Sequence, residues 1–342
     1  MDLNASLASA RDALYDLTNK RILITGGTGS FGQLFIKTIL ERFDPAAVIV
    51  LSRDELKQYE MQQKFDYAEG KIRFFLGDVR EVERLKQAFR HVDVVVHAAA
   101  LKQVPAAEYN PFEAIKTNIL GAKNVIDAAI ACDVEHTIAL STDKAANPVN
   151  LYGATKLCSD KLFTAAGNYV GVGRSRFSVV RYGNVVGSRG SVVPFFLKKK
   201  VEGVLPITDK RMTRFWITLQ QGVDFVLDTL GLMEGGEIFV PKLPSMNIVD
   251  LAEAVAPGVK IEVVGIRPGE KLHEVMVPED DARSTIELED RYVVLSSVTN
   301  PETSKWSKKG TKCEDGFKYS SDLNDQWLTI DELRKMSVPF DA

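Results

Sequence analysis

From Arg21 to about Arg181, short apolar runs alternate with longer segments of helical periodicity. The runs are almost continuously apolar, which is typical of parallel strands covered on both faces. The alternation predicts an α/β fold with a doubly wound parallel sheet, whose ligands bind at the carboxyl ends of the strands. The predicted strands are Arg21–Thr25, Val48–Leu51, Ile72–Leu76, Val92–His97, Thr137–Leu140 and Phe177–Val180, with helices near residues 31–42, 55–66, 80–90, 112–131 and 151–169.

The texture of the chain changes after Arg181, where glycines and prolines mark loops and the elements become shorter. A helix near 218–232 and a strand near 237–240 are expected to return to the sheet. We therefore predict an N-terminal extension (1–20), a cofactor-binding domain (21–185, with 215–245 returning to it), and a smaller substrate-binding lobe with a C-terminal tail (186–342). The extension carries Leu3, Leu7, Leu14 and Leu17, which suggest a short amphipathic helix on the body or on a neighbouring subunit.

Composition excludes several classes of protein. The formal net charge of −3 gives no electrostatic basis for a nucleic-acid or anionic-membrane partner. No apolar run reaches the roughly 18 residues of a membrane-spanning helix. The three cysteines are far apart and form no CxxC pair, so neither a disulfide framework nor a metal site is indicated. These features predict a cytoplasmic protein.

A glycine-rich turn, Gly26-Gly-Thr-Gly-Ser-Phe-Gly32, lies between the first predicted strand and the first predicted helix. Its backbone amides can approach a pyrophosphate, and the helix N-terminus favours negative charge. Such a turn is weak evidence alone, but here it has the strand–turn–helix context that dinucleotide binding requires. The predicted cofactor contacts at this turn are Gly26, Thr28, Gly29, Ser30, Phe31 and Gly32.

The end of the second strand indicates the type of dinucleotide. An acidic residue there usually binds the adenosine ribose and would repel a 2′-phosphate. Here Ser52 and Arg53 end the strand and Lys57 follows, so a hydroxyl and two cations favour NADP over NAD. Asp54 opposes this interpretation unless it caps the next helix. Later strand ends add Asp78, Val79 and Ala98 to the cofactor set.

Tyr152 and Lys156 are four residues apart on one predicted helix, so they share a face. A neighbouring ammonium is expected to lower the pKa of the phenol, which can then take a hydroxyl proton while nicotinamide takes the hydride. The preceding strand ends in Ser141 and Thr142. An ordinary surface pair is the alternative for Tyr152 and Lys156, and the upstream strand argues against it.

Longer blocks of sequence resemble one family within the extended short-chain dehydrogenase/reductase superfamily, whose cofactor domain has the Rossmann fold. That family is the inverting UDP-N-acetylglucosamine 4,6-dehydratases (5-epimerising) of the pseudaminic acid pathway, which decorates flagellins. The resemblance implies a nucleotide-sugar substrate and places Asn184, Thr208 and Arg267 in its pocket. The blocks are residues 52–57, His97–Lys102, Ser141–Pro148, Arg181–Gly190 and Arg267–Glu274.

Asp143 and Lys144 follow Thr142, where a plain reductase needs no further ionisable pair. Oxidation of C4 acidifies the C5 hydrogen, and Lys144 is expected to remove it if its pKa falls towards neutrality. Asp143, kept protonated, is expected to donate to the C6 oxygen as water leaves. A surface ion pair in a turn is the alternative.

The second lobe should also supply donors to the two phosphates of a UDP-sugar. Lys102 and Asn184 are candidates, and the Arg267 guanidinium suits phosphate geometry. The histidines His97 and His273 are isolated from other metal ligands and are expected to have structural roles. The superfamily's habit and the amphipathic extension predict a homo-oligomer.

Two rival functions remain open on the sequence. A UDP-sugar C4-epimerase would share the cofactor site, Tyr152 and Lys156 but has no use for an acid–base pair. A non-catalytic NADP-sensing protein would have no use for the hydride-transfer residues. The product, or its absence, separates all three.

Overall fold

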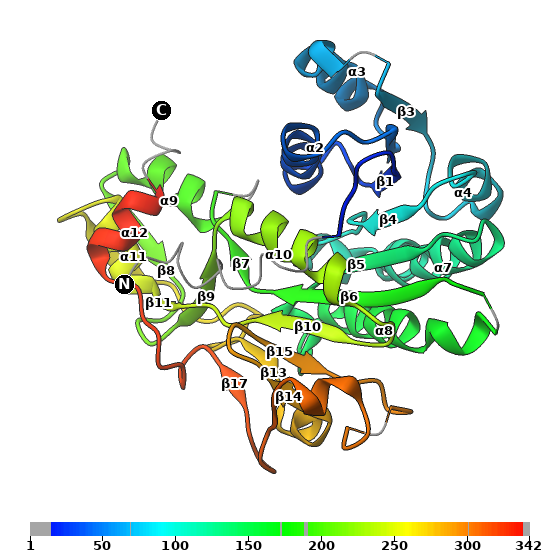
Figure 1. The fold of residues 1–342 in the computed structure, drawn as a ribbon. Coiled ribbons are helices and arrows are strands. Elements are labelled where there is room, and N and C mark those ends of the chain that lie inside the picture. The colour runs from blue at the N-terminus through cyan, green and yellow to red at the C-terminus, as the bar shows by residue number, and fades with distance from the viewer. Residues whose placement is uncertain (1–14, 69, 172, 188–190, 300, 338–342) are drawn as a thin grey trace.

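The computed structural model describes residues 15–68, 70–171, 173–187, 191–299 and 301–337 (Figure 1). Most of the predicted N-terminal amphipathic helix lies outside these ranges. Leu17, its last apolar position, is fully buried against the body, and the described residues before the first strand form a turn rather than a helix.

A ten-stranded sheet runs through the molecule in the order β16-β14-β15-β10-β6-β5-β4-β1-β2-β3. The seven neighbouring strands β10-β6-β5-β4-β1-β2-β3 of this sheet are parallel. The order 3-2-1-4-5-6 of the first six strands is that of a doubly wound sheet. The predicted fold class is thereby confirmed. The parallel strands are β1 (Arg21–Thr25), β2 (Ala47–Ser52), β3 (Ile72–Leu76), β4 (Val94–His97), β5 (His136–Thr142), β6 (Arg176–Tyr182) and β10 (Ile238–Pro241).

Helices cover both faces of this sheet (Figure 1). On one face α2 lies beside α10, and on the other α4, α7 and α8 pack in a row. A salt bridge of 2.7 Å between Arg42 and Asp224 also joins α2 to α10. The helices between the parallel strands are α2 (Ser30–Arg42), α3 (Glu55–Lys64), η2 (Asp66–Ala68), α4 (Val82–Ala88), α5 (Val104–Tyr109), α6 (Pro111–Ile115), the π-helix η3 (Lys116–Leu120), α7 (Gly121–Ala131), η4 (Asp143–Ala145), α8 (Leu151–Ala165), η5 (Ala166–Tyr169) and α10 (Leu219–Leu232).

The C-terminal part of the chain also enters the main sheet, which the sequence did not predict. The polar stretch near Asp280 forms the helix η6 (Glu279–Ser284), which leads into β14 (Thr285–Glu287) and β15 (Arg291–Val294). The strand β15 pairs antiparallel with β10. The edge strand β16 (Thr311–Lys312) follows the helix η7 (Lys305–Lys308). These strands have two to four residues, too few for periodicity to be read from the sequence.

A second lobe lies at one end of the sheet and has its own apolar core (Figure 1). Phe196, Trp216, Met246 and Leu251 are buried in that core. Its elements are β7 (Asn184–Val185), α9 (Val192–Lys200), β8 (Val204–Ile207), β9 (Thr213–Ile217), β11 (Ser245–Asn247), α11 (Ile248–Val255), β12 (Lys260–Val263) and α12 (Ile330–Ser337), and the small sheet of β13 (Val275–Val277) and β17 (Tyr319–Ser320) follows β12 in the chain.

The three cysteines, Cys132, Cys158 and Cys313, are all free. Among the described residues, no helix is both long enough and apolar enough to cross a bilayer.

Candidate active site

One cleft of about 1560 Å³ lies at the carboxyl ends of the parallel strands and is lined by residues of both lobes. This is the position where doubly wound sheets bind their ligands. Every residue that the sequence analysis assigned to the cofactor or to catalysis lines this cleft: Gly26, Thr28, Gly29, Ser30, Phe31, Gly32, Ser52, Arg53, Lys57, Asp78, Val79, Ala98, Thr142, Asp143, Lys144, Tyr152 and Lys156.

The glycine-rich turn forms one end of the cleft. Gly29 is the N-cap residue of α2, so the first amides of that helix open towards the cleft. Gly32 allows the helix to approach the turn closely, because a Cβ at this position would lie 2.4 Å from the carbonyl oxygen of Gly27. The turn therefore has the close packing and the free amides that a dinucleotide pyrophosphate requires.

Polar groups at the ends of β2 and β3 form the neighbouring rim. The Arg53 side chain is 51% exposed and its guanidinium lies 3.6 Å from the Asp78 carboxylate. Asp54 caps α3 by accepting a hydrogen bond from the backbone NH of Lys57, as its proposed capping role requires. The ammonium of Lys57 also pairs with Asp54 at 2.6 Å, a closer ion pair than that of Arg53 with Asp78.

The catalytic candidates meet where β5 gives way to η4 and α8. The Thr142 hydroxyl donates to Asp143 Oδ1 at 2.8 Å, and the Lys144 ammonium donates to the same oxygen at 3.1 Å. Gly153 lets α8 pack directly on η4, because a Cβ there would lie 2.2 Å from the carbonyl oxygen of Lys144. The glycine after Tyr152 thus brings the phenol close to Asp143 and Lys144.

The electrostatics of Tyr152 differ from the sequence-based expectation. Burial raises the pKa of Tyr152 to about 12, although the Lys144 charge and the Thr142 hydroxyl act in the opposite direction. The nearby Lys156 was expected to lower this pKa, but its ammonium donates to the carbonyl of Leu140 at 2.8 Å. Burial also lowers the pKa of Lys156 itself, against the charge of Asp160.

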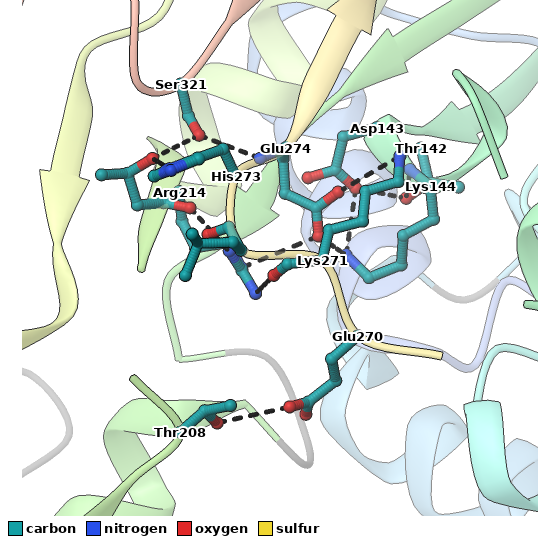
Figure 2. A network of polar contacts seen from close by, with 12 residues as sticks. Thr142, Asp143, Lys144, Thr208, Arg214, Glu270, Lys271, His273, Glu274 and Ser321 are labelled. Atoms are coloured by element: carbon teal, nitrogen blue, oxygen red, sulfur yellow. Dashed lines mark hydrogen bonds and ion pairs between the residues drawn. The ribbon is translucent and has the colours of Figure 1, made fainter. Parts of the chain in front are cut away.

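The pKa of Lys144 also differs from the sequence-based expectation, because its ammonium lies between two buried carboxylates (Figure 2). Its Nζ is 3.1 Å from Asp143 Oδ1 and 3.3 Å from Glu274 Oε1. Burial alone would lower the pKa of Lys144, but the charges of Asp143 and Glu274 outweigh it and raise that pKa above its ordinary value. The expectation of a pKa near neutrality was therefore wrong, because the contact with the second carboxylate joins residues far apart in the chain.

The predicted substrate residues fall into two groups. Lys102 and Asn184 line the cleft, and Asn184 Oδ1 is a buried acceptor that pairs with no described group of the chain. Thr208 and Arg267 do not line it. They converge instead on Glu270, which accepts a hydrogen bond of 3.3 Å from Thr208 and lies 3.8 Å from the Arg267 guanidinium.

Several cleft and near-cleft residues escaped the sequence analysis. The buried indole NH of Trp216 and the hydroxyl of Ser191 line the cleft and have no hydrogen-bond partner among the described residues. Glu274, the last residue of the block that begins at Arg267, contacts Lys144, and Lys271 of the same block contacts Glu274. Neither residue was assigned to the site from the sequence.

The two histidines considered for metal binding have hydrogen-bonded partners. His97 Nδ1 lies 2.8 Å from the Thr25 hydroxyl, and His273 Nδ1 lies 2.8 Å from the Thr213 hydroxyl. Burial lowers the pKa of His97 to about 3, so the ring is neutral.

The sheet order, the glycine-rich turn, and the Tyr152–Lys156 pair beside Thr142 define an enzyme of the extended short-chain dehydrogenase/reductase superfamily. Residues 22–296 match the family model described as "Polysaccharide biosynthesis protein". The chain belongs to this family.

Two curated relatives bear on the rival functions. The inverting UDP-N-acetylglucosamine 4,6-dehydratase of Campylobacter jejuni strain 81-176 is 57% identical over 92% of this chain and 96% of its own length. The UDP-glucose 4-epimerase of Rickettsia akari is 38% identical over 94% and 96%. The resemblance recognised in the sequence is confirmed, and the higher identity supports the dehydratase over the epimerase.

Two solved structures share the fold. Pen from Bacillus thuringiensis superposes with a TM-score of 0.85 at 36% identity, covering 95% of this chain and all of its own. DesIV from Streptomyces venezuelae, a dTDP-glucose 4,6-dehydratase solved with NAD and TYD bound, has a TM-score of 0.66 at 23% identity over 74% and 86%.

Proposed function

We propose that the protein is an NADP-dependent UDP-N-acetylglucosamine 4,6-dehydratase, a hydro-lyase that inverts C5. One observation carries the proposal: the ion pair of the buried Asp143 and the partly exposed Lys144 lines the same cleft as Thr142, Tyr152, Lys156 and the dinucleotide turn. A reductase or an epimerase needs the last three residues, whereas an elimination also needs an acid and a base.

Tyr152 is assigned the proton of the sugar C4 hydroxyl. A bound nicotinamide would accept hydride from C4 and later return hydride to C6. The Lys144 charge favours the phenolate of Tyr152, whose pKa burial raises to about 12. The Lys156 ammonium is held in place by its hydrogen bond of 2.8 Å to the Leu140 carbonyl.

Asp143 and Lys144 are assigned the elimination, and their contact supplies the required protonation states. The resting pair is a carboxylate and an ammonium joined at 3.1 Å. Transfer of one proton along this bond gives a neutral amine and a carboxylic acid. The amine of Lys144 then takes the C5 proton, while Asp143 gives its proton to the C6 oxygen that leaves as water. The step returns both residues to their resting charges, so the pair needs one shared proton. Hydride return to C6 requires a proton at C5, on the face opposite to the one that was lost, and the proton that Tyr152 took from the C4 hydroxyl balances this step.

The remainder of the cleft fits a nucleotide-sugar. Lys102 contributes a cation, and the unpartnered Asn184 oxygen, Trp216 indole NH and Ser191 hydroxyl offer both acceptor and donors. Buried polar atoms of this kind are costly unless a ligand or water satisfies them. Thr208 and Arg267 would join the site if Glu270 releases them when the sugar nucleotide binds.

Incubation with UDP-N-acetylglucosamine, followed by NMR of the product, tests the function directly. We expect a 4-keto sugar that has lost the 6-hydroxyl and has inverted C5. A product that keeps its 6-hydroxyl and differs at C4 would establish the epimerase instead. No turnover with a panel of UDP-sugars would favour the NADP-sensing protein.

The preference for NADP is tested at Arg53. We expect Arg53→Glu to weaken NADP binding far more than NAD binding, because the new carboxylate repels only the 2′-phosphate. Titration of both dinucleotides, followed by nicotinamide fluorescence, measures the two dissociation constants. The exposed Arg90, which does not line the cleft, gives the matched control Arg90→Glu. Equal weakening of both dinucleotides would remove the argument for a 2′-phosphate site.

We also propose that the active unit is a homo-oligomer, on the basis of the superfamily's habit and the amphipathic N-terminal segment. Light scattering at assay concentration, run alongside the activity measurement, should show a mass above the 37.9 kDa of one chain. A fully active monomer would contradict this expectation.

Two further assignments follow from the same proposal. The free cysteines suit a reducing compartment, which supports the cytoplasm. The product, with a ketone at C4, is suited to transamination, and we place it in the pseudaminic acid pathway that supplies flagellin glycans. Loss of pseudaminic acid from flagellin in a deletion strain, restored by the intact gene, tests this placement.

A further inference from the structure

We propose that Glu274 is a positioning residue for the dehydration, which holds the Lys144 ammonium beside Asp143 and keeps the shared proton on this pair. The inference rests on the proposed function, in which Asp143 and Lys144 exchange one proton. Its basis is a buried cluster of charges that reaches the site from the second lobe (Figure 2).

Glu274 is the anion on which the cluster converges. Its side chain is only 2% exposed, and its Oε1 lies 3.3 Å from Lys144 Nζ and 3.7 Å from Arg214 Nε. Its Oε2 lies 3.7 Å from Lys271 Nζ. Burial of a carboxylate costs free energy unless cations and hydrogen bonds surround it, so a purely structural position would be better filled by an apolar residue.

The surrounding groups are fixed to the backbone, which makes the cluster rigid. The Arg214 guanidinium donates to the carbonyls of Thr213, Lys271 and Leu272 at 2.6 to 3.0 Å. The Lys271 ammonium donates to the carbonyl of Ala146 at 2.6 Å, just beyond η4. Arg214 and Lys271 therefore hold Glu274 in place against the loop that carries Asp143 and Lys144.

The backbone of Glu274 is anchored as well. Its NH donates to the Ser321 hydroxyl at 3.0 Å, and its carbonyl accepts from the NH of Ser321 at 2.8 Å. The same hydroxyl contacts Thr213, which also holds His273. The carboxylate thus has a fixed position relative to the cleft, while the Lys144 side chain retains 28% exposure from which to reach a substrate.

Five charged or titratable side chains face Lys144, and their signs set the expected response to pH. Asp143 and Glu274 favour the ammonium, whereas Arg214 and Lys271 oppose it and the neutral phenol of Tyr152 adds no charge. Among the described residues, removal of the Glu274 charge leaves Asp143 as the one carboxylate that faces Lys144, against the two cations Arg214 and Lys271. The proton shared by Lys144 and Asp143 is then lost at a lower pH.

The test is the pH dependence of kcat in Glu274→Gln and Glu274→Asp. Because the pair needs its proton, kcat falls at high pH, and Glu274→Gln should move this falling limb to lower pH by about 1 to 3 units. The displacement of Lys144 should also lower kcat about 10- to 100-fold while KM stays near the wild-type value. Glu274→Asp keeps the charge but withdraws the carboxylate from Lys144 by one methylene. In this variant kcat should fall, and the falling limb of its pH profile should move little.

Exposed Glu279, five residues further along, gives the matched control Glu279→Gln, which should behave as wild type. A wild-type kcat and limb in Glu274→Gln, or equal losses in both Glu274 variants without a pH shift, would overturn the inference. Should Glu274→Gln fail to fold, a wild-type kcat in Glu274→Asp would overturn the inference.

A second readout separates this inference from the proposed function. The ¹³Cε signal of Lys144, assigned by its loss in Lys144→Ala, can be titrated by NMR without substrate. Its titration should move to lower pH in Glu274→Gln even if the wild-type protein does not dehydrate UDP-N-acetylglucosamine. Absence of turnover would contradict only the proposed function. A Lys144 titration that stays at the wild-type pH in Glu274→Gln would contradict only the inference about Glu274.

Discussion

Lys144→Ala should abolish dehydration while both the nucleotide-sugar and the dinucleotide still bind. Removal of a positioned general base typically costs about 10²–10⁴-fold in rate. Because Tyr152 and Lys156 remain, oxidation at C4 should still occur, so reduced nicotinamide accumulates in a single turnover and no product follows. Exchange of the C5 hydrogen with deuterated solvent should disappear together with the product. Stopped-flow absorbance and NMR in deuterated buffer measure the two effects.

The exposed Lys161 lies on α8 and gives a matched control, Lys161→Ala, which should retain wild-type turnover. Persistence of C5 exchange and near-normal dehydration in Lys144→Ala would show that another group is the base. Tyr152 and Lys102, which line the same cleft, would then be the next candidates.

The sequence predicted the parallel part of the fold well because long-range packing and local pattern agree there. The β1 strand occupies the predicted residues Arg21–Thr25, and β2 to β6 differ from their predicted bounds by at most two residues at either end. Strands buried on both faces have few polar positions, so their apolar runs are visible in the sequence. The return of a strand near 237–240 to the sheet was predicted, and the structure adds that this strand, β10, pairs with β6.

The short elements were not predictable in this way. The helix α5 begins with Val104 and a proline and has no side-chain cap, so it carries no strong start signal beyond that proline. The strands β14 to β16 depend on pairing with β10 and with one another, and their sequences contain five polar and four apolar residues. Their positions are set by tertiary contacts rather than by local preference.

The sequence predicted which candidate residues meet in the cleft, but it did not predict the directions of their pKa shifts. A motif such as Tyr152–Lys156 shows which side chains share a helix face. It does not show that Lys156 bonds to Leu140, or that Glu274 approaches Lys144 from 130 positions further along the chain. Since a pKa depends on burial and on every nearby charge, the direction of its shift required the three-dimensional arrangement.

Tyr152→Phe should block the reaction one step earlier than Lys144→Ala. The phenol is the group assigned to the C4 hydroxyl proton, and without it hydride transfer should slow by about 10²–10⁴-fold. A single turnover with UDP-N-acetylglucosamine should therefore yield no reduced nicotinamide, whereas Lys144→Ala yields it without product. Phenylalanine also removes the one titrating group of that side chain, so any remaining rate should lose the pH dependence that Tyr152 contributes.

Tyr169→Phe, at a 73% exposed position in η5, is the matched control. Formation of reduced nicotinamide at the wild-type rate in Tyr152→Phe would contradict the assignment, and the Thr142 hydroxyl, which lines the same cleft, would then have to take the proton.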